Sequence, residues 1–295
     1  MLKNFSNHLG VLLLRLLAAL PYGLLTNIGH GLGSLAAMIS SERNEVVKTN
    51  LQRCFPDLNS HDRDQLRKQH WRLLGRSLVE KSIIWFGSKE QLANMIEVQS
   101  EVDLNDRQAR ILVNMHFVGI EGSIILSALS KEQGWPRTSG FFQRMKDPFF
   151  NKKIVEWRNR FGGNSIDRQG NTIALIREIR QGSFIIIAPD IDLGLKDSTF
   201  VPFFGIQTNT ITAVSRLASI TGAQVCMMIT TLKEDGSGYI CKISKPLEHF
   251  PTDNPETDTA RLNQIFEAEV RLRPAEYYWV HKRFKNRPPN EAGFY

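Results

Sequence analysis

The sequence predicts an α/β protein with a mixed central sheet flanked by helices, preceded by an apolar helical segment at the amino terminus. Two patterns predict this fold class. The first forty residues carry very little charge, whereas after residue 106 short apolar runs alternate with helical segments. With 295 residues, of which 42% are apolar and 23% charged, the chain can bury a substantial core and has the composition of a folded protein.

The amino-terminal segment, residues 1–42, contains no Asp, Glu, Lys or Arg between Arg15 and Glu42. Its leucines follow helical spacing, and Pro21 and several glycines interrupt the run, which disfavours a single membrane-spanning helix of about 20 residues. A cleaved signal peptide is disfavoured because Arg15 divides the apolar run and no A-x-A site follows. We expect two short helices meeting at Pro21 that associate with the membrane interface, pack on the rest of the protein, or do both with different faces.

Residues 43–295 are expected to form one α/β domain, because charge density rises near residue 42 and no repeat or low-complexity linker follows. Helical patterning continues to residue 50 and resumes over residues 62–86. Four apolar runs predict buried strands at residues 111–115, 138–142, 184–188 and 225–230. The predicted helices around them span residues 121–129, 149–160, 172–180, 211–220 and 257–272.

Charge and cysteine content narrow the partners and the compartment. The net charge of +7 favours an anionic partner, such as nucleic acid, a phosphorylated lipid or an acidic protein. The three cysteines, Cys54, Cys226 and Cys241, have no CxxC spacing, and one would stay unpaired if two formed a bridge. This count favours a reducing compartment and free thiols.

The residues that carry chemistry follow the predicted strand 111–115. His116 stands at its carboxyl end, the edge where open α/β sheets bind ligands, and Glu121 comes five residues later. Within one helix that spacing would set the two side chains about 140° apart. We therefore expect His116 on a strand-to-helix turn, with Gly119 allowing the bend and Glu121 reaching back to the imidazole. Glu121 would orient one ring nitrogen, and the other would act as a general base.

The spacing of His116 and Glu121 alone leaves other interpretations open. On spacing alone, a core or surface histidine with an acidic neighbour by chance is the favoured interpretation. A zinc site is disfavoured because HExxH and a third ligand at metal spacing are absent, so no metal is expected. A serine nucleophile is disfavoured because no G-x-S-x-G occurs.

Further motifs follow in a fixed order along the chain. They are NLQRCFP at residues 50–56, RNRFGG at 158–163, PDIDLG at 189–194, FVPFFG at 200–205 and WVHKRFKNRP at 279–288. Together with the His-x-x-x-x-Glu of residues 116–121, they resemble the lipid A late acyltransferases, the lauroyl and myristoyl transferases of Gram-negative lipopolysaccharide synthesis. These belong to the glycerolipid acyltransferase superfamily, and the similarity spans nearly the whole chain. One block departs from the family pattern Tyr-Arg-Pro, because Gln143 takes the place of the usual arginine and Arg144 is displaced by one position.

The resemblance implies a glycerolipid-acyltransferase-like fold and an enzyme that needs no cofactor. It implies transfer of a fatty acyl chain from an acyl carrier protein thioester to a hydroxyl of a phosphorylated lipid A precursor. His116 would be the general base, oriented by Glu121, and transfer would be direct because no Cys or Ser lies in the motif around His116. The expected location is the cytoplasmic face of the inner membrane of a Gram-negative bacterium, with membrane lipids as partners and no nucleic acid.

Candidate substrate-binding residues lie downstream of the dyad. Residues 137–180 contain ten basic residues, including Arg168, against four acidic ones, which suits lipid phosphates or an acidic carrier protein; solvated helix faces are the alternative. Asp190 and Asp192 follow the strand 184–188 and should lie near the same edge as His116, with turn capping or arginine pairing as equal alternatives. The candidates are Arg144, Arg158, Arg160, Asp190 and Asp192.

Two aromatic segments complete the predictions. Phe200, Phe203 and Phe204 could wall an acyl channel, although core packing is the favoured explanation for them. A basic and aromatic segment spans residues 277–285, and the mixture of aromatic and cationic side chains over residues 279–287 suits a membrane interface or a nucleic-acid surface. The alternatives to a lipid A acyltransferase are an acyltransferase acting on a glycerophospholipid or glycolipid, and a non-enzymatic basic protein that binds membranes or nucleic acid.

Overall fold

The computed structural model describes residues 2–39, 41–142, 144–167 and 172–295; Gln143 and Arg168, named above, lie outside them. The helices are α1 (Leu2–Ala18), α2 (Tyr22–Met38), α3 (Glu42–Cys54), α4 (Ser60–Phe86), α5 (Lys89–Met95), α6 (Gly122–Gln133), α7 (Pro148–Asn159), α8 (Thr172–Arg180), α9 (Ala213–Thr221), α10 (Pro255–Leu272) and the short 3₁₀ helix η1 (Pro274–Glu276). The strands are β1 (Ile96–Ser100), β2 (Arg110–Val113), β3 (Thr138–Phe142), β4 (Asn164–Asp167), β5 (Phe184–Ile187), β6 (Ser198–Phe203), β7 (Ile206–Ile211), β8 (Gln224–Leu232) and β9 (Tyr239–Pro246).

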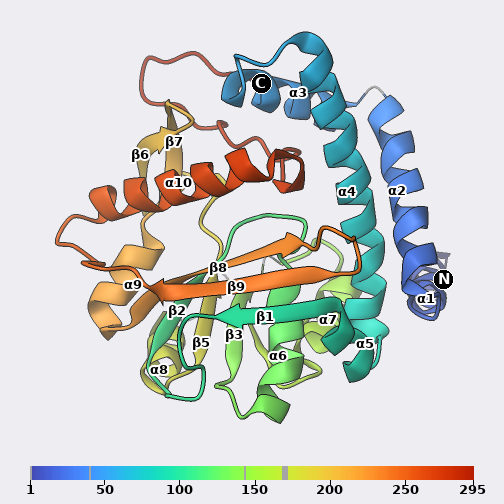
Figure 1. The fold of residues 1–295 in the computed structure, drawn as a ribbon, viewed down its shortest axis with the longest axis horizontal. Coiled ribbons are helices and arrows are strands. Elements are labelled where there is room, and N and C mark those ends of the chain that lie inside the picture. The colour runs from blue at the N-terminus through green and yellow to red at the C-terminus, as the bar shows by residue number, and fades with distance from the viewer. Residues whose placement is uncertain (1, 40, 143, 168–171) are drawn as a thin grey trace.

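A seven-stranded sheet lies at the centre of the described chain, in the order β1-β9-β8-β2-β5-β3-β4 (Figure 1). All neighbouring strands run parallel except β8 and β9, which are antiparallel. Strands β6 and β7 form a separate antiparallel hairpin. The predicted fold class, a mixed sheet flanked by helices, is confirmed.

The four predicted strands are confirmed as β2, β3, β5 and β8. They are adjacent to one another in the sheet, in the order β8-β2-β5-β3. The prediction missed β1, β4, β9 and the β6–β7 hairpin. Strands β2 and β5 are buried along their whole length, whereas β1 and β4 are partly exposed. A search for apolar runs finds strands covered on both faces and misses strands with polar or alternating sequences. The predicted helix 211–220 begins later, at Ala213, because Ile211 is the last residue of β7.

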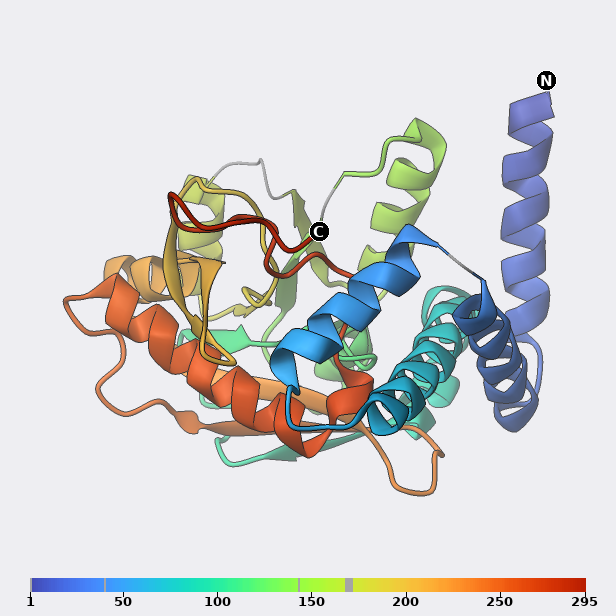
Figure 2. The same ribbon diagram turned by 90° about the horizontal axis from the view of Figure 1, so that it is seen from above.

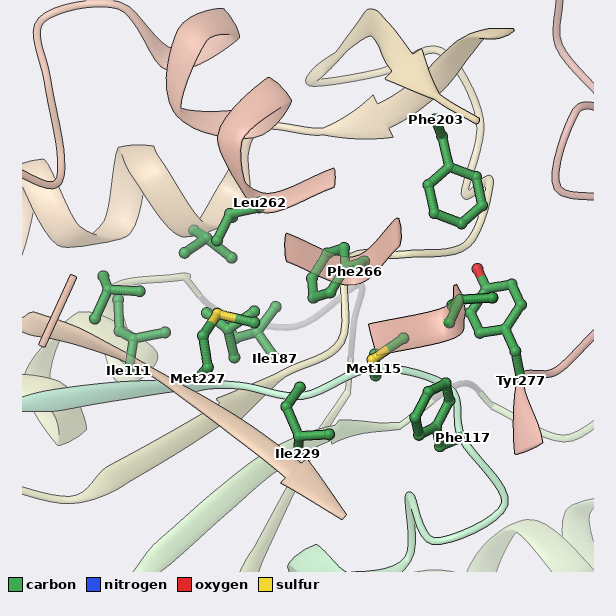
Figure 3. Close-up of a cluster of buried hydrophobic side chains, with 14 of the residues drawn as sticks. Ile111, Met115, Phe117, Ile187, Phe203, Met227, Ile229, Leu262, Phe266 and Tyr277 are labelled. Atoms are coloured by element: carbon green, nitrogen blue, oxygen red, sulfur yellow. The ribbon is translucent and has the colours of Figure 1, made fainter. Parts of the chain in front are cut away.

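Successive residues of the central strands pack on opposite faces of the sheet. On one face, Ile111 and Met227 belong to the same buried cluster as Leu262 and Phe266 of α10, which covers this face in Figure 3. On the other face, residues such as Leu112 belong to a second cluster with α4, α5 and α6. The sheet is thus sandwiched between two helical layers.

The amino-terminal segment forms two helices that meet at Pro21, as predicted, since α1 ends at Ala18 and α2 begins at Tyr22. Helix α2 lies along α4, and α1 lies at the periphery of the molecule in Figure 2. The contact is a close approach of two backbones, because a Cβ added at Gly33 would lie 2.0 Å from the carbonyl oxygen of Trp71. No helix among the described residues combines the length and apolar character needed to cross a membrane.

The outer faces of α1 and α2 are apolar. The exposed large apolar residues there are Leu9, Leu12, Leu13, Leu16, Leu24, Leu32, Leu35 and Met38. One face of α2 therefore packs on the protein while another stays uncovered in this chain, so the predicted packing is confirmed and the predicted membrane contact stays a prediction.

The carboxyl-terminal aromatic and cationic segment is largely inaccessible, which makes the predicted membrane or nucleic-acid surface wrong for most of residues 279–287, of which only Lys285 is exposed. Trp279, Arg283 and Phe284 are at most 2% exposed. Asn50 of α3 donates hydrogen bonds to the carbonyl oxygens of Trp279 (2.7 Å) and His281 (2.9 Å), which ties this segment to the helix. The aromatic side chains therefore belong to the core.

Candidate active site

His116 lies on the loop between β2, which ends at Val113, and α6, which begins at Gly122. The predicted strand-to-helix turn is thus confirmed. The carboxyl-terminal segment holds this loop in place, because the Tyr278 N–H donates to the His116 carbonyl (2.9 Å) and the Val118 N–H donates to the Glu276 carbonyl (2.9 Å). The carboxyl-terminal segment therefore helps to fix the position of the His116 loop through main-chain hydrogen bonds.

Gly119 in the same loop is required by space rather than by an unusual backbone angle. A Cβ added there would lie 2.7 Å from the carbonyl oxygen of Thr230 on β8. Its absence lets the loop run directly over the neighbouring strand.

The side chain that contacts the imidazole is Asp190. Its Oδ1 lies 2.7 Å from Nδ1 of His116, and its Oδ2 accepts a hydrogen bond from the backbone N–H of His116 at 2.8 Å. Asp190 is fully buried, whereas His116 is partly exposed and borders a cavity. Burial opposes ionisation of the carboxyl, but the charge of His116 and these hydrogen bonds hold the pKa of Asp190 below its ordinary value.

The sheet register explains why these two residues meet. Strands β2 and β5 are parallel neighbours in which Val113 is paired with Ile187. His116 and Asp190 each follow their strand at the third position beyond this pair. Since parallel neighbours end at the same edge, equal offsets bring the two side chains together.

Glu121 is the residue before the first turn of α6 and pairs with two cations. Its carboxylate oxygens lie 3.5 Å from Nη2 of Arg158 and 3.7 Å from Nζ of Lys81. Burial raises the cost of its charge, yet these two cations hold the pKa of Glu121 below its ordinary value. The expected hydrogen bond from the imidazole to the Glu121 carboxylate is absent from the contacts of the described residues, and Asp190 is the partner of Nδ1 instead.

A cavity of about 1370 Å³ opens beside His116. Most of its lining is apolar and comes from α4, the His116 loop, the ends of β3 and β5, α8 and α9. Among the described residues, the lysines and arginines that line it are Lys81, Arg158, Lys196 and Arg216. The cavity is larger than the roughly 300–1,000 Å³ of a typical small-molecule site, so it can hold a long apolar group together with a polar one.

The other predicted polar candidates have different places. Arg158 lines the cavity, whereas Arg160 donates to the carbonyls of Ile84 (3.0 Å) and Gly87 (2.8 Å) at the carboxyl end of α4. Arg144 forms an ion pair with Asp167, which borders the cavity. Of the predicted arginines, only Arg158 therefore reaches the cavity among the described residues.

Asp192 is hydrogen-bonded to the carboxyl-terminal part of the chain. Its oxygens accept hydrogen bonds from the backbone N–H (2.9 Å) and the side-chain amide (2.7 Å) of Asn286 and from Asn209 (2.9 Å). The Asp192 N–H donates to Nε2 of His281 at 3.0 Å. These contacts give Asp192 a structural place, joining the loop after β5 to the chain terminus.

The three phenylalanines proposed for an acyl channel are not in the lining of this cavity within the described residues. Phe203 and Phe204 are buried on the α10 side of the sheet, where Phe203 lies near Tyr277 in Figure 3. Phe204 packs edge-to-face on Phe55 with ring centroids 5.2 Å apart. Phe203 of the β6–β7 hairpin and the adjacent Phe204 belong to the buried cluster that includes α10, whereas Phe200 is half-buried and is not among the members of either buried cluster, so core packing holds for Phe203 and Phe204.

Sequence reasoning missed three cavity residues, Lys81, Lys196 and Arg216. Lys81 lies on the same helical face of α4 as the cavity residues Leu74 and Ser77, a spacing that the sequence contains. Lys196 follows the PDIDLG run after β5, and Arg216 is the fourth residue of α9. Only the tertiary arrangement brings these cations to one cavity.

His116 thus has Nδ1 bound to Asp190 and lies at the carboxyl edge of the sheet beside a large cavity, and its Nε2 has no protein hydrogen-bond partner among the described residues. An imidazole in this state can take part in general acid–base chemistry. The comparisons with known proteins make the class specific. A family model described as bacterial lipid A biosynthesis acyltransferase matches residues 1–286. The chain therefore belongs to the bacterial lipid A biosynthesis acyltransferase family and is a transferase.

Similar proteins cover nearly the whole chain. The lipid A biosynthesis lauroyltransferase of Escherichia coli (strain K12) is 30% identical over 291 residues, which cover 97% of this chain and 93% of that protein. The palmitoleoyltransferase of the same strain is 29% identical over 300 residues, with 97% and 93% covered. Its myristoyltransferase is 24% identical over 273 residues, with 91% and 82% covered.

Proposed function

We propose that this chain transfers a fatty acyl group from an acyl carrier protein thioester to a hydroxyl of a phosphorylated lipid A precursor, with His116 as the general base. The observation that carries the proposal is the state of the imidazole. Nδ1 of His116 is bound to Asp190, and Nε2 has no protein hydrogen-bond partner among the described residues. His116 also borders the large apolar cavity. Nε2 is thus the nitrogen left to accept a proton.

The reaction would proceed in two steps. The acceptor hydroxyl loses its proton to Nε2 of His116 while its oxygen attacks the thioester carbonyl carbon, giving a tetrahedral oxyanion. The oxyanion then expels the thiolate, which takes the proton from the imidazolium. A thiol has an ordinary pKa near 8.5, about the value expected of a good leaving group, so activation of the hydroxyl is the harder part.

The cations on the cavity would stabilise the negative charges of this reaction. Glu121 fixes Arg158 and Lys81 through ion pairs of 3.5 and 3.7 Å. The two cations then face either the acceptor phosphates or the carbonyl oxygen as it becomes an oxyanion. Glu121 thereby contributes by holding cations in the cavity.

Direct transfer, without an acyl-enzyme, is part of the proposal. All three cysteines are buried and none lines the described cavity. Burial raises the pKa of Cys226 and of Cys241 to about 11, which disfavours the reactive thiolate. With no activated thiol at hand, attack of the acceptor hydroxyl on the thioester needs only a base and positioned substrates.

We also propose that residues 1–42 dock the enzyme on the cytoplasmic face of the inner membrane. The leucines on the outer faces of α1 and α2 form an uncovered apolar surface. An anchored enzyme meets its lipid acceptor in the membrane, while its carrier protein arrives from the cytosol.

Product analysis tests the proposed function. The purified protein would be incubated with acyl carrier protein loaded with a saturated acyl chain, and with either a phosphorylated lipid A precursor or a glycerophospholipid in mixed micelles. We expect mass spectrometry to show one added acyl ester on the lipid A precursor, and underacylated lipid A in a deletion strain. Acylation of the glycerophospholipid alone would favour the alternative acceptor, and no acylation of either lipid would reject the proposal.

A further inference from the structure

The carboxylate of Asp190 binds His116 at two nitrogens, the backbone N–H and Nδ1 of the imidazole. Asp190 Oδ2 accepts the His116 backbone N–H at 2.8 Å, and Asp190 Oδ1 lies 2.7 Å from Nδ1. The backbone of Asp190 is also held in place, because the hydroxyl of Tyr277 donates to the main-chain carbonyl oxygen of Asp190 at 2.9 Å. Both Asp190 and Tyr277 are almost completely buried.

This arrangement fixes which ring nitrogen carries the proton. An ionised carboxylate can only accept hydrogen bonds, so the nitrogen facing it must be a donor. Nδ1 of the neutral imidazole therefore carries hydrogen, and Nε2 carries the lone pair. A general base must have its lone pair on the nitrogen that faces the substrate.

We infer that Asp190, and not Glu121, is the positioning residue that sets the tautomer and the orientation of His116. This inference rests on the proposed function, in which Nε2 of His116 removes the hydroxyl proton. The carboxylate of Asp190 also stabilises the imidazolium that forms during transfer. Glu121, whose carboxylate faces Arg158 and Lys81, acts on the cations instead.

The contact between His116 and Asp190 is not evident from the sequence, because 74 positions separate the two residues. Glu121, in contrast, is only five residues from His116. The pair arises because β2 and β5 are parallel neighbours and both residues lie three positions beyond the pair Val113 and Ile187. The acidic residue that is near His116 in the sequence is therefore not the one that contacts its imidazole.

The substitution Asp190→Asn gives a specific signature. The asparagine amide has one oxygen that accepts and one nitrogen that donates. The His116 backbone N–H requires the oxygen, so the amide nitrogen faces Nδ1 and donates to it. Nδ1 then becomes the acceptor, and the hydrogen moves to Nε2. The variant keeps its shape but places a proton on the atom that must accept one, a change that costs about 10⁴-fold in turnover in Ser-His-Asp enzymes.

The test is nitrogen NMR of the full-length protein labelled with ¹⁵N-histidine. The sequence has seven histidines, and the signal lost in His116→Gln assigns His116. We expect a protonated Nδ1 and an unprotonated Nε2 in the native protein, the reverse in Asp190→Asn, and the native pattern in Glu121→Gln. An unchanged tautomer in Asp190→Asn, or a reversal in Glu121→Gln, would overturn the inference.

A matched control separates tautomer control from loosened packing. Tyr277→Phe removes the hydrogen bond to the Asp190 carbonyl but leaves the carboxylate intact. We expect this variant to melt at a lower temperature and to keep the native tautomer. A reversal in Tyr277→Phe would show that general loosening, rather than the carboxylate, moves the proton, and would contradict the inference.

Acyl transfer distinguishes this inference from the function on which it rests. With acyl carrier protein thioester and the lipid A precursor, we expect kcat to fall by about 10³- to 10⁴-fold in Asp190→Asn with KM changed only a few fold. If His116→Gln is inactive but Asp190→Asn has native turnover and tautomer, the inference fails and the proposed function stands. If His116→Gln is fully active, the proposed function fails whatever the tautomer is.

Discussion

The two ends of the chain both carry large apolar side chains and have opposite placements. The amino-terminal segment has few charges and the carboxyl-terminal segment has several basic residues, yet both were expected at a membrane interface. The leucines of α1 face outward, with Leu16 58% exposed, whereas Trp279 of the carboxyl-terminal segment is completely buried. The carboxyl-terminal segment can be buried because its polar groups have hydrogen-bond partners inside the protein. For example, the guanidinium of Arg283 donates to the carbonyl oxygen of Asn209 at 2.7 Å. Composition alone does not reveal whether such partners exist.

This comparison assigns different consequences to substitutions at the two ends. Changes in the carboxyl-terminal segment should cost folding stability and disturb the His116 loop that it supports. Changes on the outer face of the amino-terminal helices should cost membrane association with little effect on folding.

The largest expected effect belongs to Trp279→Ala. The indole is buried against Tyr277 and Phe55, with ring centroids 4.8 and 5.9 Å away, and its N–H donates to the Pro274 carbonyl at 2.6 Å. We expect the free energy of unfolding to fall by about 3–5 kcal/mol, as for other buried aromatic residues. Urea unfolding followed by circular dichroism measures it. A loss below about 1 kcal/mol would mean that this segment is not part of the core.

The next effect is on the pH dependence of stability, through His281. Burial, together with the charges of Arg283 and His116, lowers the pKa of His281 from 6.5 to about 4. The unfolded chain then binds a proton near pH 6.5 that the folded protein accepts only near pH 4. This contribution to stability is therefore complete above pH 6.5 and is lost as the pH falls to about 4, by up to about 3 kcal/mol.

The substitution His281→Gln isolates that proton. Glutamine keeps an acceptor for the Asp192 N–H but does not titrate in this range. We expect the plot of unfolding free energy against pH, measured from pH 7 to 4, to be less steep in this variant than in the native protein. The difference in slope should correspond to about one proton fewer taken up on unfolding. Identical slopes in the two proteins would contradict the assignment.

A smaller effect is expected on the inner face of α2. A Cβ at Gly33 would lie 2.0 Å from the Trp71 carbonyl oxygen, so Gly33→Ala must push α2 away from α4 and should cost about 1–3 kcal/mol. Gly31 of the same helix has open space around its Cβ position and serves as the control. Gly31→Ala should be neutral or stabilising by up to about 1 kcal/mol. Equal melting temperatures for the two variants would show that α2 does not pack on α4 in solution.

The smallest effect on stability is expected on the outer face of α1. Replacement of Leu12, Leu13 and Leu16 by glutamine keeps helix propensity nearly constant and should change the unfolding free energy by only about 0.5 kcal/mol per site. Co-sedimentation with vesicles of anionic phospholipid should nevertheless fall sharply. Leu272→Gln, at an exposed leucine of α10, is the control and should sediment like the native protein. Unchanged sedimentation of the triple variant would place the membrane contact elsewhere.

Much of the central sheet was predictable, and its periphery was not. Strands such as β2 and β5 are buried on both faces and therefore appear as short runs of apolar residues. Strand β4 reads Asn-Ser-Ile-Asp and has no such run, so pairing with β3 is what makes it a strand. Pairing between distant segments is a tertiary property that a local pattern does not contain.

The site was predictable in its location and not in its partners. The position of His116 at the carboxyl end of a strand followed from an apolar run and a general rule of α/β sheets. Its contact with Asp190 depends on the register of β2 against β5, which only the folded sheet defines. Arg160 looked like a substrate ligand by charge, but the free carbonyls at the end of α4 bind it.

The central claim is that Nε2 of His116 is the base for acyl transfer, and the most direct test is the single-turnover rate of His116→Gln. The substitution would be made in the full-length protein, with acyl carrier protein thioester and lipid A precursor both saturating and with the melting temperature checked against the native protein. The account predicts a folded variant whose rate of ester formation falls by about 10²- to 10⁴-fold. A folded variant that forms the same ester at the native rate would contradict it.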